Sequence, residues 1–133
     1  MVSPPAVTAV VLNWCGEVVT TECLRSLLAS DYKPLKALLV DNGSPDGSFE
    51  RLRALFPNLD FIQTGKNLGY AGGNNRGIEW AMRDGADYVL ILNNDTVLEP
   101  STVSKLVDAA ERGERIGGVV PKILYHDEPD RIW

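Results

Sequence analysis

The sequence predicts an α/β fold, a three-layer α/β/α sandwich built on a mainly parallel sheet. Strand-like apolar runs alternate with helix-like segments along the chain, and such alternation favours a parallel sheet with helices on both faces. Two of the apolar runs also end abruptly in carboxylate and amide side chains, as strands do at the ligand-binding edge of open α/β sheets. The 133 residues are the size of one domain.

Four short apolar runs are predicted to be strands. They are residues 7–12, 35–40, 59–63 and 88–92. The first is apolar and rich in β-branched residues, which is typical of a strand buried on both faces. Residues 117–120 and 123–125 are predicted to be two further extended pieces.

Four segments between and after these runs are predicted to be helices, because their apolar residues recur at helical spacing. They are residues 21–30, 48–56, 71–83 and 100–112. Pro34 ends the first, Gly85 suits the C-terminal end of the third, and Pro100 suits the first turn of the fourth. The expected inward-facing residues are Leu24, Leu27 and Leu28, then Phe49, Leu52, Leu55 and Phe56, then Ile78, Ala81 and Met82, and finally Val103, Leu106, Val107 and Ala110.

Composition excludes several classes of function. The formal net charge is −5 and there is no basic stripe, so we expect no nucleic-acid partner, although a nucleotide pocket remains compatible. Cys15 and Cys23 lack the spacing and the further ligands of a zinc site, and His126 is the only histidine. We find no signal peptide and no apolar run of the roughly 20 residues that a membrane span needs.

The strongest local signal is the run 88–92, which stops at Asn93, Asn94 and Asp95. A Mg²⁺ or Mn²⁺ ion that bridges two phosphates needs only one or two protein oxygens, which this strand end can supply. The alternative is a polar cap on the following turn. Asp41 ends the second strand in the same way and could accept hydrogen bonds from a base or ribose, or form an Asx-turn.

Two further segments could contact a nucleotide. Asn13 and Trp14 follow the first strand with an amide and an aromatic face, although Trp14 could equally be a packing residue. Residues 65–77 form a glycine- and amide-rich loop that leads into a helix, where close backbone approach and the helix N-terminus favour phosphate. Lys66 and Arg76 of this loop could meet phosphate charge or lie in solvent.

Together these segments resemble the nucleotide-sugar-binding part of the family 2 glycosyltransferases, which have the Rossmann-like GT-A fold of nucleotide-diphospho-sugar transferases. The matching words are VVLNW at 10–14, LVDNGS at 39–44, NLGYAGGNN at 67–75 and LNNDT at 92–96. The tail, with PKILY at 121–125 and PDRIW at 129–133, resembles the rhamnosyltransferase-like branch. The resemblance implies that residues 1–133 are the donor-binding part of a domain whose acceptor-binding part is absent.

The resemblance also implies roles for individual residues. Asp41 would contact the uracil or thymine ring and its ribose, with Asn13 and Trp14 lining the base pocket. The nucleotide-binding set would be completed by loop and strand-end residues, namely Asn67, Gly69, Asn74, Asn93 and Asn94. Asn93 and Asp95 would occupy the first and last places of the family's D-x-D motif, with both residues facing the metal. Asn93 replaces the usual aspartate there, so cation binding would be weaker.

The activity implied is transfer of a sugar, with inversion, from a dTDP- or UDP-sugar to a saccharide or lipid-linked acceptor. dTDP-rhamnose is favoured by the tail, and the cofactor would be Mg²⁺ or Mn²⁺. No catalytic residue is assigned, because the family's base lies beyond the D-x-D region. The expected location is the cytoplasm, with the inner face of the membrane as an alternative for a longer protein. A non-catalytic nucleotide-binding module is the main rival, and a phosphoacceptor receiver domain is disfavoured by Asn13-Trp14-Cys15 at the first strand end.

Overall fold

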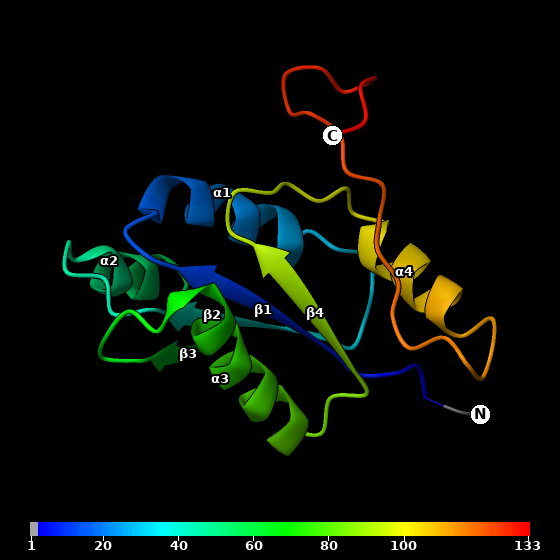
Figure 1. The fold of residues 1–133 in the computed structure, drawn as a ribbon, viewed down its shortest axis with the longest axis horizontal. Helices are drawn as coiled ribbons and strands as arrows, with labels where there is room; N and C mark the ends of the chain where they lie inside the picture. Colours follow the sequence, from blue (N-terminus) through cyan, green and yellow to red (C-terminus); the bar gives the residue numbers. More distant parts are fainter. Residues whose placement is uncertain (1–2) are drawn as a thin grey trace.

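Four strands and four helices alternate in a computed structural model of the chain, which describes residues 3–133 (Figure 1). The strands are β1 (Val7–Asn13), β2 (Leu35–Asp41), β3 (Asp60–Gln63) and β4 (Tyr88–Asn93). The helices are α1 (Glu17–Leu28), α2 (Ser48–Leu55), α3 (Gly69–Arg83) and α4 (Thr102–Ala110). All four strands are parallel, in the order β3-β2-β1-β4.

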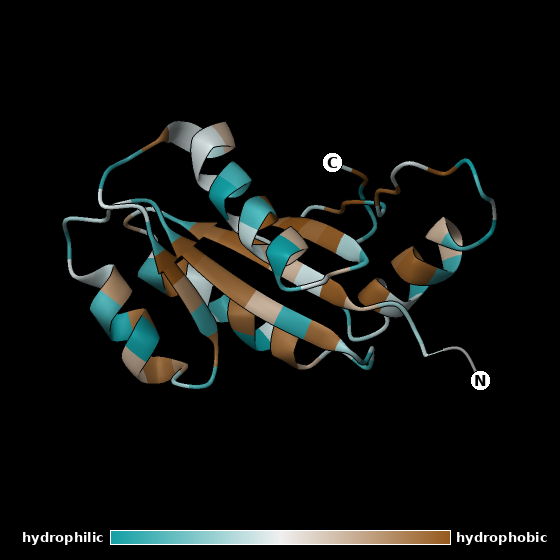
Figure 2. Ribbon diagram, turned by 90° about the horizontal axis from the view of Figure 1, so that it is seen from below, coloured by the Kyte–Doolittle hydropathy of each residue, from teal (hydrophilic) through white to brown (hydrophobic). Residues whose placement is uncertain are grey.

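The helices cover both faces of the sheet, as the alternation predicts. Ala9 and Val11 of β1 face a core that includes Leu24 of α1 and Leu52 of α2. Val10 points the other way, into a smaller core beneath α3. The strands are the most hydrophobic elements of the fold (Figure 2), because both of their faces are covered.

Strand register brings the carboxyl ends of the strands to one edge of the sheet. Asn13 at the end of β1 lies opposite Asp41 of β2, and Asp41 lies opposite Gln63 of β3. On the other side of β1, Leu12 lies opposite Asn93 of β4. The chain order reverses between β1 and β4, which makes this the switch point where open α/β sheets bind ligands.

All four helices differ from their predicted bounds, and three differ in the side chains that they bury. α4 begins at Thr102, so Pro100 precedes the helix and does not lie in its first turn. α1 begins at Glu17 and α3 at Gly69, each earlier than predicted. Leu28, Leu55 and Met82 were expected to face inward, but they are 48%, 51% and 68% exposed. Each lies in the last turn of its helix.

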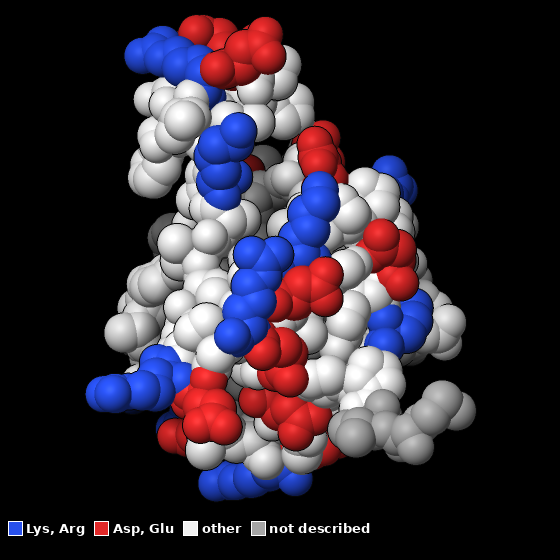
Figure 3. All heavy atoms as spheres, turned by 90° about the vertical axis from the view of Figure 1, so that its right-hand side faces the viewer, with Lys and Arg blue, Asp and Glu red and all other residues white. Residues whose placement is uncertain are grey.

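Residues 117–133 join no strand of the four-stranded sheet. The second predicted extended piece makes only an isolated antiparallel bridge between Leu124 and Ile132, and the amide of Trp133 donates to Ile123 at 3.0 Å. This turn stands away from the sheet, and charges of both signs are interspersed over it and the neighbouring face (Figures 1 and 3). Within residues 3–133, no helix is both long and apolar enough to cross a bilayer.

Candidate functional site

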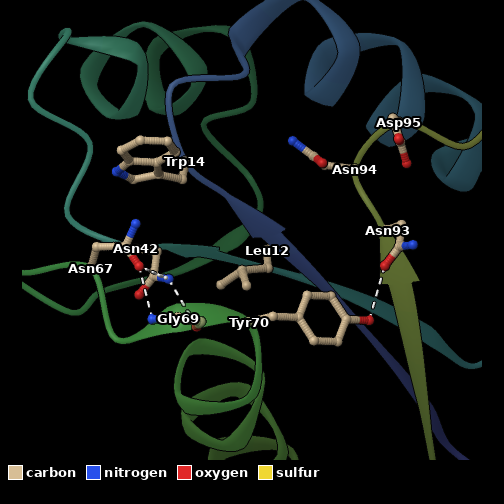
Figure 4. Close-up of a pocket in the computed structure, with 9 residues that line it drawn as sticks. All are labelled: Leu12, Trp14, Asn42, Asn67, Gly69, Tyr70, Asn93, Asn94 and Asp95. Carbon is tan, nitrogen blue, oxygen red and sulfur yellow. Dashed lines mark hydrogen bonds between the residues drawn. The ribbon is translucent and has the colours of Figure 1, made fainter.

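A groove of about 420 Å³ opens at the switch point (Figure 4), and we call it the strand-end groove. Its lining comes from the ends of β1 and β4 and from the loops that follow β2 and β3: Leu12, Trp14, Asn42, Asn67, Gly69, Tyr70, Asn93, Asn94 and Asp95. A second hollow of about 410 Å³ lies between β4, α4 and residues 116–119, but its lining is largely apolar. Of these two hollows, the strand-end groove is the one that combines an exposed aromatic face with several converging polar side chains.

The groove has two chemically different walls. Trp14 stands on one side with 54% of its surface exposed, which offers a flat face to a planar ligand. Asn93, Asn94 and Asp95 stand on the opposite side, where β4 ends (Figure 4). Leu12 lies between the walls, so a ligand that spans the groove would meet an aromatic ring at one end and polar oxygens at the other.

Asn42 holds the loop that leads into α3. It is 2% exposed, and its Nδ2 donates to Asn67 Oδ1 at 3.1 Å and to the Gly69 carbonyl at 3.0 Å. Its Oδ1 accepts from the amide of Leu68 at 3.0 Å. One buried amide therefore satisfies three groups of the loop, which fixes the N-terminus of α3 at the groove.

Tyr70 connects the first turn of α3 to the end of β4. Its hydroxyl donates to Asn93 Oδ1 at 2.9 Å, while its carbonyl accepts from Asn74 Nδ2 at 3.0 Å. Asn74 is 4% exposed and its Oδ1 is buried without a partner among the described residues. Asn74 therefore supports Tyr70 from within the helix and does not line the groove.

Asn13 and Asp41 lie beneath the groove, sealed from solvent at 0% exposure. Asp41 Oδ1 accepts from Asn13 Nδ2 at 2.9 Å and from the Ser44 hydroxyl at 2.6 Å, and Oδ2 accepts from the Ser44 amide at 3.0 Å. Both carboxylate oxygens thus accept hydrogen bonds from protein groups. Neither side chain lines the groove, and in this geometry both support the loops that carry Trp14 and Asn42. Their direct contact with the base stays a prediction.

The structure brings together six of the predicted site residues at the groove: Trp14, Asn67, Gly69, Asn93, Asn94 and Asp95. Tyr70 and Asn42 line it as well, and neither was singled out from the sequence. An aromatic residue directly after the glycine that begins α3 was the available signal for Tyr70. The sequence does not distinguish Asn42, because the adjacent carboxylate of Asp41 is the stronger candidate ligand.

The groove carries little positive charge. Among its lining residues no lysine or arginine occurs, and Asp95 is the one carboxylate. Lys66 is exposed outside the lining, and Arg76 lies 3.6 Å from Glu79 on the surface of α3. The sequence-based suggestion that these two cations meet phosphate is not supported by their positions.

The donor set fits a divalent cation that arrives with a ligand and does not fit one held by protein alone. Within residues 3–133 no group of three His, Cys, Asp or Glu side chains converges on a metal site. Asp95 is exposed at the groove beside two amides. Mg²⁺ and similar ions are commonly held by one or two carboxylates together with substrate phosphates.

Behind the β4 end, the Cys23 thiol is packed against the sheet. Its Sγ donates to the carbonyl of Asn93 at 3.6 Å, and burial raises the pKa of the Cys23 thiol to about 11. The side chain is therefore a neutral packing group at physiological pH. In the loop between β2 and α2, a hydrogen bond from Ser48 lowers the pKa of Asp46 below its usual range.

The sequence model of the family described as "Glycosyl transferase family 2" matches residues 10–133, which is nearly the whole chain. The chain belongs to glycosyl transferase family 2. This match confirms the family resemblance that the four sequence segments indicate. All four segments lie within the matched region.

Curated relatives of this family 2 chain are sugar transferases. It is 37% identical over 112 residues to the N-acetylglucosaminyl-diphospho-decaprenol L-rhamnosyltransferase of Mycobacterium tuberculosis, covering 78% of this chain and 36% of the relative. It is 29% identical over 108 residues to the glucosyl-dolichyl phosphate glucuronosyltransferase of Haloferax volcanii, covering 75% and 33%. The chain spans about a third of the length of these relatives.

Solved structures confirm the GT-A fold. The mannosyltransferase PcManGT of Pyrobaculum calidifontis, in complex with GDP-Man and Mn²⁺, matches with a TM-score of 0.68 at 23% identity, covering 79% of this chain and 32% of that one. Staphylococcus aureus TarS 1–349 in complex with UDP-GlcNAc matches with a TM-score of 0.68 at 19% identity, covering 92% and 41%. The 133 residues therefore have the architecture of one part of larger transferase folds.

Proposed function

We propose that this chain is the donor-binding part of an inverting glycosyltransferase that uses a dTDP- or UDP-sugar. The observation that carries the proposal is the strand-end groove, with an exposed Trp14 face at one side and Asn93, Asn94 and Asp95 at the other. Nucleoside, diphosphate and sugar occur in that linear order in such donors, and the groove offers a stacking surface followed by polar groups. Rhamnose is supported by the 37% identity to a rhamnosyltransferase.

In this proposal the base stacks on Trp14 and the diphosphate lies toward Asp95. The groove lining lacks lysine and arginine, so a divalent cation, when bound, would supply the positive charge that stabilises a departing diphosphate. Asp95 would hold that cation, and Tyr70 and Leu12 would form the surface beneath the phosphates. The loop pinned by Asn42 excludes water from one side of the nucleotide.

An inverting transfer also needs a base that takes the proton of the acceptor hydroxyl. Asp95 is the one carboxylate in the groove and is committed to the cation. We propose that the base belongs to an acceptor-binding part outside these 133 residues, in agreement with the third of the relatives' length that the chain spans. The acceptor is proposed to be a saccharide or a lipid-linked saccharide, and the location cytoplasmic, at or near the inner face of the membrane.

The test is a panel of UDP, dTDP, GDP and CDP with the 133-residue chain, with and without Mn²⁺, read by thermal shift and calorimetry. A nucleotide at 100 times its Kd should add about 2.7 kcal/mol to the free energy of unfolding. We expect Mn²⁺-dependent binding of UDP or dTDP, lost in Asp95→Asn and kept in Asp108→Asn, the same change on exposed α4. A folded chain that binds none of the four nucleotides would contradict the proposal.

A further inference from the structure

Asn94 occupies the middle place of Asn93-Asn94-Asp95, and its side chain is held in one orientation from behind. Its Nδ2 donates to the hydroxyl of Thr20 at 2.9 Å. Thr20 is on α1 and is 0% exposed, so it cannot itself contact a ligand in the groove. A buried hydroxyl of one element thus orients a groove residue of another, 74 positions away in the chain.

The direction of this hydrogen bond is fixed by the groups on the other side of Thr20. The amide of Gly16, which can only donate, points at Asn13 Oδ1 at 3.2 Å, so this atom of Asn13 is the acceptor. The Thr20 hydroxyl lies 2.9 Å from the same oxygen and must donate its single hydrogen there. Thr20 is left able only to accept, so the atom that Asn94 turns toward it is Nδ2.

Asp41 sets the same polarity from the far end. Its carboxylate accepts from Asn13 Nδ2 at 2.9 Å, so the amide of Asn13 has its nitrogen toward Asp41 and its oxygen toward Thr20. The chain of donors therefore runs from Asn94 to Thr20, to Asn13 and to Asp41, and three of its four members have no exposed surface. Reversing any one amide would place two donors or two acceptors together.

Gly16 closes the space behind Asn94. A Cβ built on Gly16 would lie 2.8 Å from Asn94 Nδ2 and 3.4 Å from Asn13 Oδ1. The Asn94 amide therefore fits against a bare backbone and has no room to retreat. Its Oδ1 has no donor among residues 3–133 and is not a buried atom, so the oxygen is left open at the groove.

The side-chain oxygen of Asn93 differs from that of Asn94, because Asn93 Oδ1 already accepts a hydrogen bond from the Tyr70 hydroxyl at 2.9 Å. We propose that Asn94, rather than Asn93, supplies the open acceptor oxygen beside Asp95, and that Thr20 and Gly16 are the positioning residues that hold it there. The oxygen would face an electron-poor group of the bound donor, either the cation or a hydroxyl. This inference rests on the proposed function for its ligand, whereas the orientation of Asn94 rests on the hydrogen bonds alone.

The orientation is tested without ligand by the side-chain amide signals of Asn94 in a ¹H–¹⁵N spectrum. We expect slow hydrogen exchange in the unaltered chain, fast exchange in Thr20→Val, and slow exchange restored in Thr20→Ser, which keeps the hydroxyl. Fast exchange in the unaltered chain would overturn the orientation, whatever the chain binds.

The role toward the donor is tested by a double-mutant cycle on Mn²⁺-dependent nucleotide binding. Thr20→Val and Gly16→Ala should each weaken binding about fivefold, the size of one displaced hydrogen bond, and Thr20→Ser should stay within about twofold. Neither change should matter further in an Asn94→Ala background. Equal losses in both backgrounds would show that Thr20 acts through general stability and would overturn its positioning role.

Two arms identify the group that the oxygen faces. If it is the cation, Asn94→Ala raises the Mn²⁺ concentration needed for half-maximal binding, and Asn93→Ala does so less. If it is a hydroxyl, Asn94→Ala weakens nucleotide binding by the same factor at limiting and at saturating Mn²⁺. The Mn²⁺ concentration needed for half-maximal binding is then unchanged. A larger effect of Asn93→Ala in both arms would overturn the inference, and failure of the unaltered chain to bind any nucleotide would overturn the proposed function instead.

Discussion

Replacing Gly77 by alanine should destabilise the fold even though alanine is the better helix former. Gly77 is buried in α3, and an added Cβ would lie 2.3 Å from Val10 Cγ1 and 3.1 Å from Val40 Cγ2. Val10 and Val40 belong to the two central strands and are 0% exposed, so neither side chain has space to turn away. The contact can be relieved only if α3 moves off the sheet.

The net effect is a difference between two opposing contributions. Alanine in place of glycine in a helix interior stabilises by about 1 kcal/mol. Overpacking a core typically costs about 1–3 kcal/mol, and a contact so far inside the ~3.5–4.0 Å optimum points to the upper end of that range. We therefore expect Gly77→Ala to lower the free energy of unfolding by about 2 kcal/mol, an effect of steric origin.

Urea denaturation followed by circular dichroism measures this loss. The matched controls are Glu79→Ala and Glu79→Gly in the same helix at an exposed position. Both controls lose the 3.6 Å contact with Arg76, so their difference gives the alanine–glycine preference of α3 alone. Gly77→Ala could instead raise the free energy of unfolding by as much as Glu79→Ala exceeds Glu79→Gly. In that case α3 could not pack on the sheet as closely as described. The groove would then also differ from the one described, because α3 carries Tyr70.

Four further predictions concern Asp41, the two cysteines and Trp14. Asp41→Asn should cost about 1–3 kcal/mol in urea denaturation, because an amide nitrogen would face a donor where a carboxylate oxygen now accepts, and stability within error of the unaltered chain would refute that role. Burial raises the pKa of the Cys23 thiol from its ordinary value of 9.0 to about 11, so this group favours folding only while it is neutral. The free energy of unfolding should therefore be insensitive to this group below pH 9 and fall as pH rises from 9 to 11, with a smaller fall in Cys23→Val. A thiol reagent at neutral pH should label exposed Cys15 and spare Cys23 in the folded chain. Trp14→Ala should weaken nucleotide binding in calorimetry by roughly 1–3 kcal/mol, the worth of a base stacked on an aromatic ring, and unchanged affinity would contradict the proposed base position.

Much of the fold could be predicted because its signals are local. β1, β2 and β4 are apolar runs bounded by polar residues, so their limits can be predicted from the sequence. Asp41 and Asn93 are the polar residues at which β2 and β4 end. Helix faces were harder to predict. Ala81 is buried as its spacing predicts, but Met82 is exposed. The other buried residues of α3 are Gly73, Asn74 and Gly77, because this helix approaches the sheet mainly through its smallest side chains.

Sequence alone determined that polar strand ends lie at one edge of a parallel sheet. Strand direction and the change from apolar to polar residues each depend on a short segment of consecutive residues. Only the tertiary structure decided which of those side chains meet the groove. Asp41 and Asn94 look alike as strand-end ligands, but Asp41 is enclosed by Ser44 and Asn13, whereas Asn94 is turned outward by Thr20. Those partners come from other elements, and the direction of an amide depends on what its neighbours can donate or accept.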